Sequence, residues 1–127
     1  MVKRFILVLL AAFCLLGPTV LMAQETTAAI QGTVKDPTGA VIAGATVEVT
    51  SPDLIGTKSM QTDSAGFYRI INLPPGEYTL TVTAPNFKKY RQTGINLSVG
   101  KVPTMDVTME LGTVTSVVEV TAGAPLV

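Results

Sequence analysis

The sequence predicts an all-β fold, an antiparallel β-sandwich of about seven strands with Greek-key connections, preceded by a signal-peptide helix. Short segments that alternate strictly between apolar and polar residues recur along the chain, and turn residues separate them at regular spacing. Beyond the first segment there is no helical periodicity and no room for crossover helices. Because successive side chains of a strand point to opposite faces, such alternation indicates sheets that cover a core on one face.

The first segment has the features of a secretory signal. The basic pair Lys3-Arg4 precedes an apolar run over residues 5–16, and the small residue Ala23 follows a Gly-Pro break. We expect cleavage after Ala23, so that residues 1–23 form the signal peptide and the mature chain is exported. The alternative is an uncleaved anchor, because residues 5–23 approach the roughly 20 residues that span a bilayer.

The inventory of reactive side chains is small. Cys14, the one cysteine, lies within the apolar run, and the bulky Phe13 before it does not suit a lipid-attachment site. The mature chain therefore has no disulfide, and a packed core must supply its stability. Since the chain has no histidine and no mature cysteine, zinc, copper and haem sites and histidine-based catalysis are excluded. We expect no cofactor and no enzyme activity.

Length and charge limit the domain count and the partners. Without Lys3 and Arg4 the mature chain has 7 basic and 9 acidic residues, a net charge of −2, which does not suit nucleic acid. About a hundred mature residues can bury a single core. We place the sandwich domain at residues 24–112 and a linker strand or tail at residues 113–127.

The first strands are separated by two related turns. Alternation predicts strands over residues 28–35 and 45–50, a more polar strand over 58–62, and a strand over 68–73. The turns Asp36-Pro37-Thr38-Gly39 and Asp63-Ser64-Ala65-Gly66 share Asp at the first position and Gly at the fourth, which fits a type I turn.

The clearest alternation follows the Pro-Pro-Gly turn at residues 74–76. The side chains of Tyr78, Leu80, Val82 and Ala84 share one face, and threonines occupy the other, which predicts a half-buried strand. Turns at Pro85-Asn86 and Gly100 separate further strands over residues 87–92, 95–99 and 105–111. Residues 114–121 form either an extra strand or an extended linker.

Five residues could bind a ligand. They are Phe67, Lys88, Lys89, Tyr90 and Arg91. The three cations around Tyr90 could bind an acidic glycan or a lipid headgroup, and an exposed Phe67 next to Tyr90 could stack on a sugar ring. The alternatives are an edge strand whose charges prevent sheet-to-sheet pairing, and an ordinary surface aromatic.

The acidic residues have a structural and a chemical interpretation. Asp36 and Asp63 could be calcium ligands, but calcium takes six to eight oxygens and these turns lack a dense array of Asp and Asn, so capped turns are favoured. The pairs Asp36/Glu48 and Glu77/Asp106 could be an acid and a base, although nothing in the sequence places either pair in one pocket.

Three blocks carry a resemblance to a known family. They read Gly32-x-Val34-x-Asp36-x-x-Gly39-x-x-Ile42-x-Gly44-Ala45-x-Val47, then Thr62-Asp63-x-x-Gly66-x-Tyr68, then Leu73-Pro74-x-Gly76-x-Tyr78-x-Leu80-x-Val82-x-Ala84. From about Ala28 to Leu111 the chain resembles the carboxypeptidase regulatory-like domain family, which is similar in fold to transthyretin-like and starch-binding-like sandwiches. The sequence departs from the family at Ala43, where Pro is frequent, and at Asn86, where Gly is frequent.

The resemblance implies a non-catalytic module of a bacterial envelope. Such domains often follow a signal peptide and precede the plug and barrel of TonB-dependent outer-membrane receptors, and residues 117–122 resemble the linker strand before the plug. We therefore expect a periplasmic or outer-membrane docking or spacer domain of a Gram-negative receptor system, as an amino-terminal fragment or a stand-alone remnant.

This expectation includes the partners. We expect an envelope protein or a receptor, no nucleic acid, and membrane contact only through the signal peptide or a receptor partner. The alternative function is a carbohydrate-binding module of starch-binding-like fold, with a glycan as ligand. The absence of tryptophan weakens that alternative, because such sites use an aromatic platform.

Overall fold

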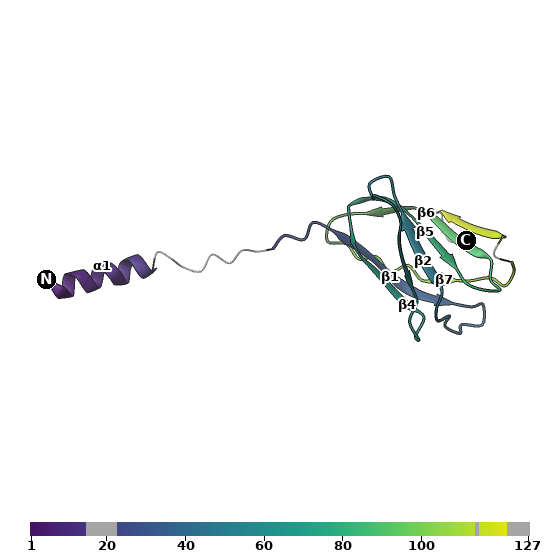
Figure 1. The fold of residues 1–127 in the computed structure, drawn as a ribbon, viewed down its shortest axis with the longest axis horizontal. Helices are drawn as coiled ribbons and strands as arrows, with labels where there is room; N and C mark the ends of the chain where they lie inside the picture. The colour runs from purple at the N-terminus through teal and green to yellow at the C-terminus, as the bar shows by residue number, and fades with distance from the viewer. Residues whose placement is uncertain (15–22, 114, 122–127) are drawn as a thin grey trace.

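Two sheets stacked face to face form the sandwich, and a short helix precedes them (Figure 1). The computed structural model describes residues 1–14, 23–113 and 115–121. The helix α1 spans Val2–Cys14, and the strands are β1 Ala28–Lys35, β2 Thr46–Thr50, β3 Lys58–Gln61, β4 Phe67–Leu73, β5 Gly76–Thr83, β6 Lys89–Leu97, β7 Val107–Thr108 and β8 Val117–Thr121. The predicted β-sandwich is confirmed.

The strand order crosses repeatedly between the sheets. One sheet has three strands in the order β4-β1-β7, and the other has five in the order β3-β2-β5-β6-β8. The strand β5 returns to lie beside β2, and β4 contacts β3 across the seam between the sheets, so β2 to β5 follow a Greek-key path. Two pairs depart from the antiparallel expectation, because β7 lies parallel to β1 and β8 lies parallel to β6.

Two predicted strand boundaries differ from the structure. Residues 87–92 and 95–99 were predicted as separate strands, but β6 continues through both. A register irregularity opposite Tyr78 and a positive φ of 71° at Gly94 accommodate the extra residue as a bulge. The strand predicted over 105–111 shortens to the two residues of β7, with single backbone bonds from Met105 and Met109 to β1 on either side.

The amino-terminal predictions lie partly outside the described residues. The Gly17-Pro18 break belongs to that part, so α1 is the portion of the predicted signal that the structure describes. Among the described residues no helix combines the length and apolarity that a bilayer crossing requires. Cleavage after Ala23 and the domain limits at residues 24 and 112 stay predictions.

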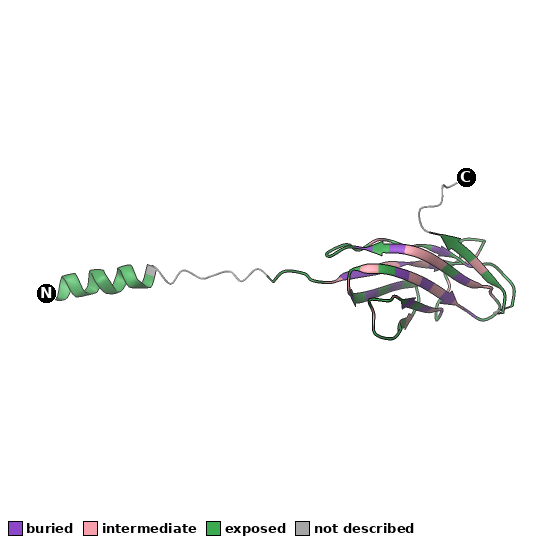
Figure 2. Cartoon of the chain, turned by 90° about the horizontal axis from the view of Figure 1, so that it is seen from above, coloured by how far each residue is buried: buried purple, intermediate pink, exposed green. Residues whose placement is uncertain are grey.

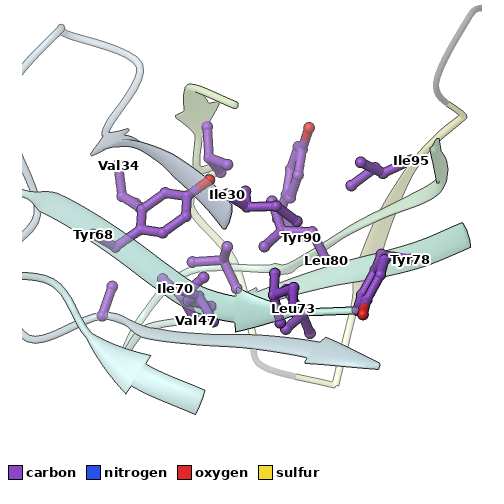
Figure 3. Packing of buried hydrophobic residues seen from close by; sticks show 14 of the residues in the cluster. Ile30, Val34, Val47, Tyr68, Ile70, Leu73, Tyr78, Leu80, Tyr90 and Ile95 are labelled. Atoms are coloured by element: carbon purple, nitrogen blue, oxygen red, sulfur yellow. The ribbon is translucent and has the colours of Figure 1, made fainter. Parts of the chain in front are cut away.

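The core lies between the sheets, where alternate residues of each strand turn inward (Figure 2). The face predicted from the alternation after residue 76 is confirmed, because Tyr78, Leu80, Val82 and Ala84 are all buried. They pack against residues of the other sheet that include Ile30, Val34, Tyr68 and Leu73 (Figure 3). Apolar side chains from both sheets therefore form one interior, as the lack of a mature disulfide requires.

The short strand β7 is held by a tyrosine that reaches across the three-stranded sheet. Tyr68 of β4 is fully buried, and its hydroxyl donates a 2.6 Å hydrogen bond to the Met105 carbonyl. A Cβ at Gly32 would collide with both groups, so only glycine lets them meet over β1. Burial, together with the negative charge of Asp106, raises the pKa of Tyr68 above its ordinary value.

Truncation of an inward side chain tests the assigned faces. Leu80→Ala should lower the free energy of unfolding by about 2–5 kcal/mol, because it removes buried methyl groups and leaves a cavity. Glu48→Ala, on the exposed face of neighbouring β2, should change it by less than about 0.5 kcal/mol. Urea unfolding of both variants measures the difference, and equal losses would refute the face assignment.

Removing the Tyr68 hydroxyl tests the link to β7. Tyr68→Phe should cost about 1–3 kcal/mol at neutral pH, because the Met105 carbonyl loses its donor. Tyr90→Phe is the matched control and should cost less, since the Tyr90 hydroxyl bonds only the half-buried Gln92 side chain, which water can also reach.

Comparison of the wild type with Tyr68→Phe at high pH tests the raised pKa of Tyr68. A group with a raised folded-state pKa stabilises the protein fully below its unfolded pKa, here 10.0, and loses that contribution as the pH rises further. The stability difference between wild type and Tyr68→Phe should therefore narrow in urea unfolding above that pH. A difference that widens there would contradict the burial of this hydroxyl.

Candidate functional site

The five predicted ligand-binding residues do not form one cluster. Phe67 is the first residue of β4 in the three-stranded sheet, and it is 38% exposed. This agrees with the prediction that its side chain points to the opposite face from that of Tyr68. The other four lie just before or in β6 of the five-stranded sheet. Tyr90 belongs to the buried core, where its hydroxyl donates to the Gln92 side chain at 2.9 Å. Phe67 and Tyr90 therefore cannot form the expected shared platform for a sugar.

The basic segment, defined as Lys88–Arg91, is covered by the part of the chain that runs from the end of the predicted domain into the predicted tail. We call this part the C-terminal segment, described for residues 110–113 and 115–121. Its Glu110 accepts a 2.7 Å backbone bond from Lys88 and forms a 3.6 Å ion pair with the Lys88 ammonium. Further along, Glu119 pairs with Arg91 at 4.0 Å.

Backbone hydrogen bonds extend the contact between the C-terminal segment and β6. The amide of Lys89 donates to the Ser116 carbonyl at 2.8 Å, and β8 then runs parallel to β6 from Val117 to Thr121. The strand β6 thus lies between β5 and β8 and is not an edge. The alternative prediction of a charged edge strand is wrong for the basic segment, because β8 satisfies the backbone that such charges would protect.

The two ion pairs are weak in energy but specific in placement. Their side chains are between 38% and 69% exposed, so solvent screens each pair to at most about 1 kcal/mol. Among the described residues both ion pairs join the basic segment to the C-terminal segment. The available sequence signal for this contact was a pair of glutamates after the strand with three cations, Glu110 at the end of the predicted domain and Glu119 in the tail. The register cannot be deduced from that signal.

The aspartates of the two turns act as caps. One carboxylate oxygen of Asp36 accepts bonds from the Thr38 hydroxyl at 2.6 Å and from the amides of Thr38 and Ala40. Asp63 accepts from the amides of Ala65 and Phe67 in the same way. The Thr38 hydroxyl, with these amides, lowers the pKa of Asp36. Capped turns, as favoured from the sequence, account for both aspartates.

The proposed acid–base pairs are divided between the sheets. Asp106 accepts a 2.9 Å hydrogen bond from the Thr33 amide at the three-stranded sheet, whereas Glu77 lies near the start of β5 in the other sheet. Asp36 follows β1, and Glu48 lies on the exposed face of β2. Neither pair forms a pocket. Within the described ranges no cluster of three or more acidic, histidine or cysteine side chains could hold a metal ion.

Two structural polar residues were missed from the sequence. Thr62 is buried, and its hydroxyl accepts from the Ala45 amide at 2.9 Å while donating to the Ile42 carbonyl at 2.7 Å. Lys58 of β3 donates to the Ile71 and Asn72 carbonyls across the seam between the sheets. Neither has a local pattern that reveals its partner, because each partner lies in a distant segment.

The outer face of the three-stranded sheet carries one arrangement that suits a sugar. Phe67 pairs in register with Thr33, and Arg69 pairs with Gln31. The Arg69 guanidinium donates to the Gln31 amide oxygen at 3.5 Å, and the Gln31 amide nitrogen donates to Thr104 at 3.4 Å. An exposed ring thus lies near a row of polar side chains. The hydrogen bonds among these side chains are long and therefore weak, so a ligand could replace them.

Comparison with known proteins identifies the sandwich. The family model of the carboxypeptidase regulatory-like domain matches residues 29–110. A TonB-dependent transporter, Oar, from Myxococcus xanthus is 36% identical over 81 residues. That match covers 64% of this chain and 8% of the transporter, so the chain corresponds to a small part of its relative's length.

Solved structures share the fold at low identity. A cohesin–X-dockerin complex from Acetivibrio cellulolyticus superposes with a TM-score of 0.54 and 22% identity, covering 67% of this chain and 58% of that one. A putative carbohydrate-binding protein from Bacteroides uniformis superposes with a TM-score of 0.53 and 17% identity, and the match covers 65% of this chain and 40% of that one. Hydroxyquinol 1,2-dioxygenase from Pseudomonas putida superposes with a TM-score of 0.53 and 12% identity, and the match covers 72% of this chain and 58% of that one. At these identities the likeness concerns the fold alone.

The capped turns predict a response to acid but not to calcium. Because the pKa of Asp36 is lowered in the folded protein, its contribution to stability is present above the pKa of 3.8 that the group has in the unfolded chain, and it is lost as the pH falls below that value. Asp36→Ala should therefore lower the melting temperature at neutral pH. Between neutral and acid pH its melting temperature should fall by less than that of the wild type. Adding millimolar CaCl₂ should not raise the melting temperature of the wild type, and a clear increase that Asp36→Ala abolishes would contradict the capping role.

Proposed function

Because the chain belongs to the carboxypeptidase regulatory-like domain family, we propose that it acts as a non-catalytic docking or spacer module of a TonB-dependent outer-membrane receptor system. The observation that carries the proposal is the 36% identity to a transporter over 81 residues. The structure is consistent with it, since every buried side-chain polar atom among the described residues has a hydrogen-bond partner. These buried polar groups therefore contribute to the stability of the fold.

The proposal includes an export route and a partner. The helix α1, which carries Lys3-Arg4 near its start and continues as an apolar run, belongs to a signal peptide that is cleaved after Ala23, and the mature module then lies in the periplasm or at the outer membrane. Its partner is a receptor or another envelope protein. The exposed, largely polar outer faces of both sheets suit a module that contacts a partner without reacting with it.

A second function has one specific observation in its favour. The ring of Phe67 and the row formed by Arg69, Gln31 and Thr104 combine a stacking surface with polar groups, and a putative carbohydrate-binding protein shares the fold. A glycan array with wild type and Phe67→Ala distinguishes the two functions. Binding that Phe67→Ala abolishes would establish the glycan function, whereas an array without hits would remove it.

Fractionation of the native host tests the proposed location and partner. Protein expressed from its own gene should be found in the envelope fraction, and mass spectrometry should identify Gln24 as the mature amino terminus. Chemical cross-linking followed by capture with an antibody against the sandwich should recover a TonB-dependent receptor polypeptide. Recovery from the cytosol with Met1 intact, or envelope protein with no receptor polypeptide, would contradict the proposal.

A further inference from the structure

The outer edge of β6 is occupied by a strand that is not part of the module. The family match ends at residue 110, whereas β8 begins at Val117. In Figure 1 the yellow β8 lies along β6 at the margin of the five-stranded sheet, which agrees with its parallel pairing from Lys89↔Val117 to Thr93↔Thr121. Within the family domain alone, β6 would be an edge with unpaired backbone groups.

We propose that this edge is a strand-docking surface, that β8 covers it reversibly, and that its partner is an extended acidic segment rich in β-branched residues. Such strand addition is an established mode of peptide recognition, in which backbone bonds supply affinity and side chains supply specificity. The proposal does not rest on the assignment to a receptor system, because it depends only on the geometry around β6.

The cover is held weakly by comparison with the strands it joins. Four residues of β8 are exposed and the fifth, Val118, is only partly buried, whereas β5 on the other side of β6 has three fully buried residues. Since apolar burial is the main force that retains a strand, β8 is held mainly by backbone bonds to β6 and by the screened ion pair between Glu119 and Arg91. Local opening is therefore far easier for β8 than for β5.

The chemistry of the partner follows from what now occupies the edge. Lys88, Lys89 and Arg91 lie along it; β8 places Glu119 beside Arg91, whereas Glu110, at the end of the family match, lies beside Lys88. The rest of β8 is valine and threonine, which suit an extended strand. A competing strand gains the same contacts when it supplies a carboxylate opposite Arg91, and a basic strand meets repulsion from three cations.

The register shows how to open the cover selectively. In a parallel pair only alternate residues of a strand donate to a given neighbour. Because Lys89 donates to Ser116, the amides of Val118 and Val120 face β6, while those of Val117 and Glu119 face solvent. Val118→Pro therefore removes a bond to β6, and Val117→Pro is a matched control that places the same ring where no bond is lost.

A binding assay on the whole chain tests the proposal. The probe is a fluorescently labelled peptide of residues 115–121, Thr-Ser-Val-Val-Glu-Val-Thr, and a second peptide carries Lys in place of Glu. Val118→Pro should bind the first peptide at least about tenfold more tightly than Val117→Pro, because its edge is open more of the time. The lysine peptide should bind Val118→Pro more weakly. Equal binding by the two variants, or none by Val118→Pro, would overturn the proposal.

Amide hydrogen exchange on the unmodified chain provides an independent test that needs no variant to fold. The amides of Val118 and Val120 should exchange at least about a hundredfold faster than those of β5, and with little dependence on denaturant. Exchange of β8 amides only at the rate of global unfolding would show that the strand is an integral part of the sandwich and would overturn reversible covering.

Discussion

The close approach of the β7 segment to β1 at Gly32 is the constraint on which the rest of the structure depends. It lets the Tyr68 hydroxyl donate a hydrogen bond to the Met105 carbonyl, and it brings the fully buried Val107 and Met109 over the core. Without this strand the three-stranded sheet would be a hairpin-like pair, and one side of the apolar interior would be exposed. The same approach directs the chain toward β6, where the C-terminal segment begins.

How much could be predicted from the sequence depends on the kind of information that each feature needs. Alternation shows which side chains share a face, so the buried set around Leu80 and the capped turns at Asp36 and Asp63 followed directly. Alternation does not show which strands pair. The parallel placements of β7 and β8 therefore could not be deduced, and neither could the bonds of Lys58 and Thr62 to distant segments.

The predicted ligand cluster shows the difference between neighbours in sequence and neighbours in space. Lys89, Tyr90 and Arg91 are adjacent in the chain, but a strand turns adjacent side chains to opposite faces, so Tyr90 enters the core while Arg91 reaches Glu119. The same alternation that places Phe67 on the exposed face of its strand places Tyr90 on the inward face of β6. The partners of the cations could not be found this way, because Glu110 and Glu119 lie in segments that are distant in the chain.

One apolar interior joins both sheets, and binding is left to the surface. The chain has no tryptophan, and its three tyrosines lie in both sheets, with Tyr68 in one and Tyr78 and Tyr90 in the other. Urea unfolding followed by tyrosine fluorescence and by far-ultraviolet circular dichroism tests this claim most directly. A single cooperative unit predicts transitions that coincide in midpoint and slope. Two separated transitions would show that the sheets unfold independently and would contradict the shared core.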